Sequence, residues 1–98
     1  MSDPASDPVI RQLRYELSDL DRSIVDAVNA RLKLVARLKD YKDSHGIPFV
    51  DPDREEWMLR YLARANRGPL SPEGLGELYA EILDLTKREV IREGKPET

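Results

Sequence analysis

The residues best suited to chemistry in this sequence are two cations within an otherwise apolar pattern. Arg31 lies between Val28 and Val35, where the helical spacing favours Leu or Ala. Lys42 follows eleven residues later and falls on nearly the same face of a helix. Long cationic side chains can cover apolar surface and extend their charge to solvent. Two cations on one apolar face are costly unless an anion meets them, so the alternative interpretation is a site for a small anion.

A second candidate is a charged cluster, Asp51-Pro52-Asp53-Arg54-Glu55-Glu56. Carboxylates are favoured near a helix N-terminus by the helix dipole, which accounts for the acids of this run. The dipole does not account for Arg54, a cation in the first turn. The spacing allows Arg54 and Glu55 to face inward together.

The composition removes most other kinds of site. The 98 residues include 16 Lys and Arg against 19 Asp and Glu, a net charge of −3. This balance argues against nucleic-acid or membrane-surface binding, which requires a basic excess. With no Cys and one His, thiolate metal sites, Cys nucleophiles and Ser-His-Asp triads are disfavoured. We expect no metal and no cofactor, and an enzyme of this kind would act on a small anion without a covalent intermediate.

The expected location of the protein follows from what the chain lacks. No apolar run approaches the roughly 20 residues of a membrane span, and no signal peptide opens the chain. We therefore expect a cytoplasmic protein without a membrane partner.

A long helix is needed to position the two cations. Asp7 can cap a helix that begins at Pro8, and no Pro or Gly interrupts the chain from residue 9 to about residue 44. Apolar residues recur there at steps of three and four, including Leu13, Leu17, Leu20, Ile24, Val28, Val35 and Leu38. Such a helix would be roughly 55 Å long, which exceeds the diameter of a 98-residue globule. Because one chain cannot cover it, the pattern predicts a homodimer.

Two further helices follow, each with a capping residue before a proline. Asp51-Pro52 opens a helix to about Ala65, and Ser71-Pro72 opens a third that ends at Gly94. No segment shows the alternation of a strand, so the predicted fold is all-α with three helices. We expect one domain over residues 8–93, with disordered tails over 1–7 and 94–98.

Several motifs, in this order and spacing, resemble the all-α chorismate mutases. They are Leu13-Arg14-x-x-Leu17-x-x-Leu20-Asp21-x-x-Ile24, Asn29-Ala30-Arg31, Lys39-x-x-Lys42, Gly46 through Glu55, Asn66-x-Gly68-Pro69-Leu70-Ser71 and Leu78-Tyr79-x-x-Ile82. The resemblance covers about residues 10–90. It implies an entangled homodimer with two equivalent sites, and the conversion of chorismate to prephenate by a Claisen rearrangement that needs no cofactor.

The resemblance also implies roles for the cations of the first helix. Arg31 is expected to bind one substrate carboxylate, and Arg14 to reach across the dimer toward the other. Lys42 is expected at the ether oxygen, where negative charge grows in the transition state.

The resemblance implies that the second helix orients the substrate ring. Glu55 is expected to accept a hydrogen bond from the ring hydroxyl, helped by the backbone of Asp51. Arg54 is expected to support the substrate carboxylates or the acidic residues.

The third helix departs from the family. Thr86 stands where the family often has Ser, and Val90 stands where it usually has Gln or Glu, a second donor to the ether oxygen. In one interpretation Val90 is an apolar wall and Lys42 acts alone. In the other the helix is rotated, and a protonated Glu89 supplies the donor.

Other functions remain compatible with these residues. The same scaffold serves isochorismate pyruvate-lyases and aminodeoxychorismate mutases. The chain is also compatible with a weak mutase subunit completed by another shikimate-pathway enzyme. A purely structural helical dimer would leave Arg31 and Lys42 unexplained.

Overall fold

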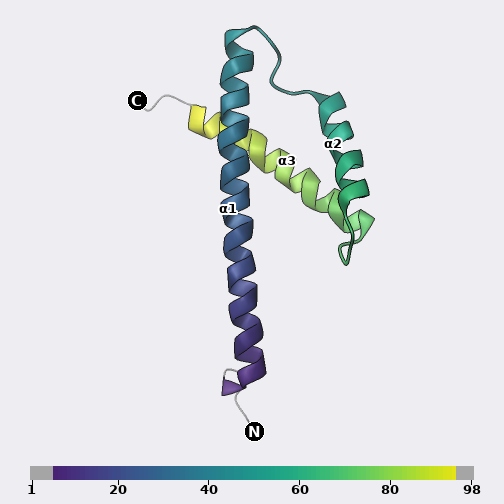
Figure 1. Ribbon diagram of the computed structural model, residues 1–98. Helices are drawn as coiled ribbons and strands as arrows, with labels where there is room; N and C mark the ends of the chain where they lie inside the picture. The colour runs from purple at the N-terminus through teal and green to yellow at the C-terminus, as the bar shows by residue number, and fades with distance from the viewer. Residues whose placement is uncertain (1–5, 95–98) are drawn as a thin grey trace. The chain divides into compact units, whose positions relative to one another are not determined.

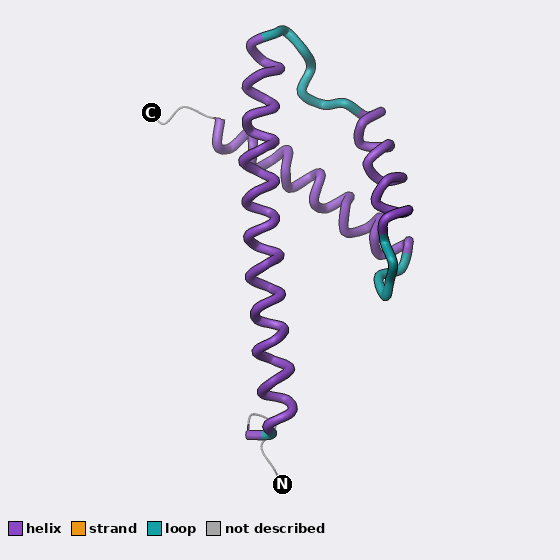
Figure 2. Tube along the Cα trace, viewed as in Figure 1, coloured by secondary structure: helices purple, strands orange, loops and turns teal. Residues whose placement is uncertain are grey.

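The computed structural model describes residues 6–94, which form three α-helices joined by two loops (Figure 1). The helices are α1 (Pro8–Ser44), α2 (Pro52–Ala65) and α3 (Pro72–Gly94). Figure 2 shows no strand in this described part of the chain. The predicted all-α class and the three helices are confirmed. Residues 1–5 and 95–98, most of the two predicted tails, lie outside the described residues.

Each helix begins with a side-chain cap followed by proline. Asp7 Oδ1 accepts a hydrogen bond from the backbone N–H two residues later, at 2.8 Å. Asp51 Oδ1 and Ser71 Oγ accept from the N–H three residues later, at 3.2 and 3.0 Å. The proline costs no hydrogen bond because the first N–H groups of a helix have no partner within it. These caps explain why the sequence located the three starts.

The end of α1 is determined by Gly46. Its φ of +66° is a left-handed conformation that glycine adopts without strain. The next residue, Ile47, donates its N–H to the Lys42 carbonyl oxygen at 2.9 Å. His45 stacks on Tyr41, with ring centroids 4.0 Å apart. This termination sets the direction in which the chain leaves Lys42 for the loop toward α2.

The described chain forms two units, and the first extends to Lys33. Its described structure consists almost wholly of the first part of α1. None of the α1 side chains is buried. The apolar residues of its stripe are more than half exposed, at 54% for Leu13, 58% for Leu17, 61% for Leu20 and 60% for Ile24. The stripe predicted from the spacing is therefore present and uncovered in the single chain.

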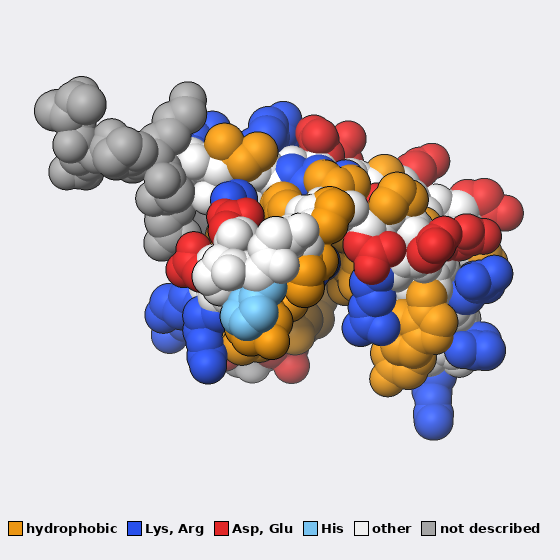
Figure 3. All heavy atoms as spheres, turned by 90° about the horizontal axis from the view of Figure 1, so that it is seen from above, with side chains coloured by type: hydrophobic (Ala, Val, Ile, Leu, Met, Phe, Trp, Pro, Cys, Tyr) orange, Lys and Arg blue, Asp and Glu red, His pale blue; other side chains and the backbone are white. Residues whose placement is uncertain are grey.

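The second unit begins at Leu34 and contains the end of α1, α2 and α3. α2 and α3 contact one another. The side chains buried in the described chain are Leu75, Thr86 and Val90, all on α3. Many large apolar side chains remain at the surface among charged ones, as the orange atoms in Figure 3 show. The single chain thus has a small core.

Candidate active site

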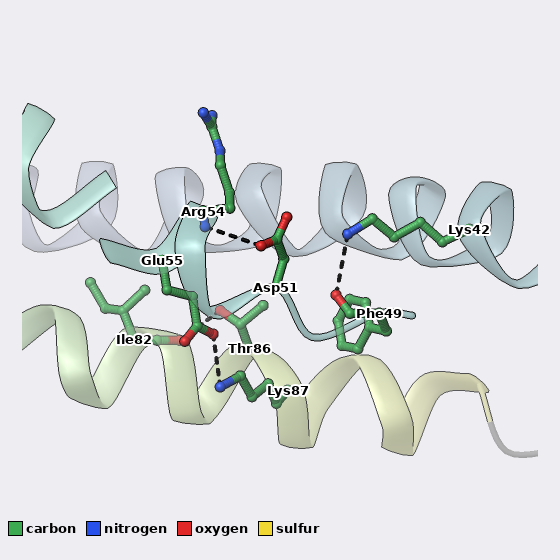
Figure 4. A network of polar contacts seen from close by, with 8 residues as sticks. All are labelled: Lys42, Phe49, Asp51, Arg54, Glu55, Ile82, Thr86 and Lys87. Atoms are coloured by element: carbon green, nitrogen blue, oxygen red, sulfur yellow. Dashed lines mark hydrogen bonds and ion pairs between the residues drawn. The ribbon is translucent and has the colours of Figure 1, made fainter. Parts of the chain in front are cut away.

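Polar side chains from three segments of the second unit make up the candidate site (Figure 4). Lys42 comes from the end of α1, and Asp51 and Glu55 come from the start of α2. Thr86 and Lys87 lie on α3. In the figure Glu55 points toward α3, where Thr86 and Lys87 lie.

Lys42 is half-buried and lies against the loop that follows α1. Its Nζ donates to the backbone carbonyl oxygen of Phe49 at 3.3 Å. The neighbouring Lys39 is instead paired with Asp43, with Nζ 2.6 Å from Oδ2. The described partner of Lys42 is thus a neutral carbonyl, so its positive charge is available to an anion.

Glu55 is paired with a residue that the sequence analysis did not single out. Lys87 Nζ lies 2.8 Å from Glu55 Oε1, and the two side chains are 35% and 29% exposed. A signal for Lys87 exists in the sequence, because it lies four residues after Leu83 and three before Val90. Residues at those spacings share a helix face. Lys87 was not identified from the sequence because most charged residues beside an apolar stripe face solvent.

Thr86 and Val90, the two residues of α3 that the resemblance singled out, are both buried. Thr86 is 6% exposed, and its Oγ1 donates to the Ile82 carbonyl oxygen at 2.6 Å. Val90 is 3% exposed. Glu89 is paired with Arg92, with Oε1 2.7 Å from the guanidinium nitrogen. The burial of Val90 agrees with the interpretation in which Val90 is an apolar wall of the site. The roles of Val90, Thr86 and Glu89 toward a substrate stay predictions.

The structure separates Arg54 from Glu55. Arg54 is exposed, and its guanidinium carbon lies 4.1 Å from the centroid of the Trp57 ring. Its side chain points away from Glu55 and Lys87 in Figure 4. The idea that Arg54 and Glu55 face inward together is therefore wrong for the single chain. Successive residues of a helix project about 100° apart, so directing Glu55 to α3 directs Arg54 elsewhere.

The remaining predicted site residues have simpler positions. The Asp51 carboxylate caps α2, and its backbone carbonyl oxygen accepts the Glu55 N–H at 3.1 Å. The ligand contact expected of the Asp51 backbone stays a prediction. Arg14 and Arg31 belong to the first unit, where Arg14 is exposed and Arg31 is half-buried. That unit is described by itself, and the joint action of these arginines with Lys42 stays a prediction.

The described residues of the second unit offer groups that suit the binding of a ligand. Among residues 6–94, no group of three or more His, Cys, Asp or Glu residues is placed to hold a metal ion. None of the described helices is long and apolar enough to cross a membrane. Lys42 offers a positive charge, and Glu55 Oε2 offers an acceptor beyond the oxygen paired with Lys87. Together they can bind an anion that also carries a hydrogen-bond donor.

Comparison with known proteins gives matches along most of the chain. The family model described as chorismate mutase type II matches residues 13–90. The 4-amino-4-deoxychorismate mutase of Streptomyces venezuelae is 40% identical over 76 residues, which cover 76% of this chain and 73% of that protein. The bifunctional chorismate mutase/prephenate dehydratase of Stutzerimonas stutzeri is 32% identical over 79 residues. The match covers 76% of this chain but only 22% of that longer protein.

Solved structures give the same result for the fold. The chorismate mutase (form II) from Thermus thermophilus is 32% identical to this chain and superposes with a TM-score of 0.82. That match covers 88% of this chain and 98% of the other. Form I of the same protein superposes with a TM-score of 0.77 at 35% identity, covering 79% of this chain and 96% of the other.

Proposed function

Since this chain belongs to the chorismate mutase type II family, we propose that it converts chorismate to prephenate on the route to Phe and Tyr. The observation that carries the proposal is the extent of the family match. Residues 13–90 include every candidate site residue, from Arg14 to Val90. The reaction is a rearrangement within one molecule, so it requires neither a nucleophile nor a cofactor.

Binding must fold a flexible dianion into a reactive shape. The enolpyruvyl arm of chorismate has to lie over the ring before the new bond can form. In this proposal Arg31 and the partner subunit's Arg14 each hold one carboxylate. Bidentate arginine–carboxylate contacts fix direction as well as distance, and this pre-orientation lowers the entropic part of the barrier.

Lys42 is proposed to act on the reacting atoms themselves. The C–O bond breaks ahead of C–C bond formation, so negative charge accumulates on the ether oxygen. A lysine aimed there stabilises the transition state more than the ground state. The 3.3 Å hydrogen bond from Lys42 to the Phe49 carbonyl supports this role, because it holds the cation without neutralising it.

Glu55 is proposed to orient the ring. Its carboxylate accepts a hydrogen bond from the ring hydroxyl through Oε2, while Oε1 stays with Lys87. The capped start of α2 holds this carboxylate at a defined place on the helix. Arg54 is proposed to support the substrate carboxylates only after leaving its position over Trp57.

The chain is proposed to work as a homodimer with two equivalent sites. The support is the uncovered apolar stripe of α1, in which Leu20 and Ile24 are 61% and 60% exposed. A soluble protein seldom leaves such a continuous stripe open. A second copy of α1 carries the same stripe and covers it by helix pairing.

A second candidate activity is the rearrangement of 4-amino-4-deoxychorismate. It is favoured by the relatives from Streptomyces venezuelae and Streptomyces pristinaespiralis, which are 40% and 35% identical to this chain. The two substrates differ by an amino group in place of the ring hydroxyl. The residues around Glu55 therefore decide between the two activities.

The test is a direct assay with purified protein alone. Loss of chorismate and formation of prephenate are followed, and 4-amino-4-deoxychorismate and isochorismate are supplied in parallel. We expect saturable prephenate formation from chorismate. Pyruvate release from isochorismate would identify a lyase instead, and activity only on adding another shikimate-pathway enzyme would identify a partner-dependent subunit. No turnover under any of these conditions would overturn the proposal.

A further inference from the structure

The ion pair between Lys87 and Glu55 differs from the other ion pairs described in this structure. Its 2.8 Å contact joins α3 to α2. Four other pairs each link residues one turn apart in a single helix, namely Lys39–Asp43, Arg60–Glu56, Arg88–Asp84 and Arg92–Glu89. Ion pairs of that local kind at a helix surface contribute little to the free energy of unfolding. The Lys87 contact therefore needs a different explanation.

The neighbours of Lys87 on its own helix account for its direction. Asp84 lies three residues earlier, within reach of Lys87 by helical spacing. It is held by Arg88, with 3.3 Å between Oδ2 and the guanidinium nitrogen. Glu89, two residues after Lys87, projects to another side of the helix. With Asp84 paired, the charge of Lys87 is directed to Glu55.

The pair changes the charge that a ligand meets beside α2. A lone Glu55 carboxylate would present one negative charge to the ring substituent. Paired with Lys87, it presents a group of zero net charge whose Oε2 still accepts a hydrogen bond. The two side chains are 35% and 29% exposed, so water screens their charges only in part.

The two candidate substrates respond oppositely to this arrangement. The ring hydroxyl of chorismate is neutral and needs only an acceptor. The amine of 4-amino-4-deoxychorismate is an ammonium group at neutral pH, as aliphatic amines are. It would bind well to a lone carboxylate but would meet the like charge of Lys87 beside Glu55. Like-charge juxtaposition is a common means of rejecting a wrong partner.

We infer that Lys87 is a specificity-determining residue that favours a neutral hydroxyl over an ammonium group at the ring position contacted by Glu55. The inference rests on the proposed function, because it places the ring substituent at Glu55. It adds the substrate class that this site accepts, which the family alone leaves open.

The test compares kcat/KM for chorismate and 4-amino-4-deoxychorismate in matched variants. The unaltered protein is expected to prefer chorismate. Lys87→Met keeps an unbranched side chain but removes the charge, and it should lower this preference by roughly tenfold or more. Lys87→Arg keeps the charge and should retain the preference. Arg60→Met removes an exposed cation of α2 that is paired only with Glu56 in the same helix, and it should leave the ratio within about twofold.

A merely structural role for the pair gives a different result. If Lys87 only holds α3 to α2, Lys87→Met lowers the thermal midpoint and reduces both kcat/KM values by one factor. An unchanged ratio would overturn the inference while leaving the mutase proposal intact, as would a preference of the unaltered protein for the amine. Failure of the unaltered protein to turn over either substrate would overturn the proposed function and, with it, this inference. Lys87→Gln, measured with circular dichroism, serves if Lys87→Met does not fold.

Discussion

Charge compensation distinguishes the cations of this chain from one another. Lys39 and Arg88 have carboxylate partners on their own helices, at 2.6 and 3.3 Å, and these contacts satisfy them locally. Lys42 donates to a neutral carbonyl, and Lys87 crosses to another helix. Lys42 can therefore offer its charge to an anionic ligand, and Lys87 alters the charge that Glu55 presents to a ligand. The predictions for single residues follow from this difference.

Removing either proposed cation should impair the reaction in its own way. Arg31→Ala should lower kcat/KM by about a hundredfold or more, roughly 3 kcal/mol, because a charge-assisted clamp is lost. Lys42→Ala should act mainly on kcat, since its contact strengthens as the ether oxygen gains charge. Steady-state kinetics measure both, and Lys33→Ala, an exposed lysine of α1, is the control. Wild-type kinetics in both variants would show that the site is misplaced.

Val90 allows a gain-of-function test at the third helix. If Val90 is an apolar wall and Lys42 alone faces the ether oxygen, Val90→Gln should raise kcat. A donor aimed at a developing charge contributes about 2–3 kcal/mol in comparable sites. Because Val90 is 3% exposed, circular dichroism must show that the longer side chain is accommodated.

The competing interpretation, in which a protonated Glu89 is the donor, predicts activity that falls as one carboxyl group ionises. A pH–rate profile of that shape, flattened by Glu89→Gln, would reverse the assignment. The 2.7 Å pair between Glu89 and Arg92 opposes this interpretation, because it holds the Glu89 carboxylate against a residue of its own helix.

Local signals at the ends of the helices determine the elements. Asp7, Asp51 and Ser71 accept backbone N–H groups at the three starts, and Gly46 terminates α1. Each signal acts through nearest neighbours, so it works before any tertiary packing exists. The termination at Gly46 also matters for the site, because Lys42 reaches the loop that follows it.

Two glycines should respond oppositely to alanine. Gly46 has a φ of +66°, so Gly46→Ala should lower the free energy of unfolding by about 1 kcal/mol. Gly76 lies within α3 with no atom within 4 Å of an added Cβ, so Gly76→Ala should raise it by about 0.5–1 kcal/mol. Denaturant unfolding at one fixed protein concentration measures both. Equal effects of the two substitutions would contradict this account of the α1 terminus.

At the scale of the whole molecule, apolar surface is in excess. The described chain buries Leu75 and Val90 as its apolar core, while Leu13, Leu17 and Leu20 stay more than half exposed. A core this small is a weak basis for a stable monomer. The second copy that we propose supplies the missing contacts, so folding and assembly should be linked.

Charge on the α1 stripe should break the assembly. The unaltered protein should sediment at about twice 11.3 kDa at low micromolar concentration. Leu20→Glu places a charge in the stripe and should shift the protein to an unfolded or monomeric state. Arg22→Glu changes an exposed residue on the opposite face and should stay dimeric. A compact helical monomer of the unaltered chain would refute the architecture.

Mixing two inactive variants tests whether each site is shared between subunits. If Arg14 serves the partner's site, a mixed dimer of Arg14→Ala and Arg31→Ala subunits retains one intact site. Activity should then recover in part after subunit exchange. Exchange shown by a mass-tagged subunit, without any recovery of activity, would count against the role of Arg14 across the dimer.

Features that depend on neighbours along the chain could be predicted from the sequence. Helical periodicity, the Asp-Pro and Ser-Pro starts and Gly46 indicated the three helices, because capping and amphipathic patterning act within a few residues. The order of the motifs indicated the family and the candidate residues. The spacing allowed Glu55 to face the interior together with Arg54, and in the structure only Glu55 is directed to α3.

Which of these charges meet depends on how the helices pack against one another. Contact between α2 and α3 joined Glu55 to Lys87, although 32 positions separate them in the chain. It also left Arg54 on Trp57, facing away from that pair. Helix propensity and capping do not predict such pairings, because the pairings depend on how one helix is rotated against another. That rotation is set by how the side chains of α2 and α3 fit together where the two helices contact one another.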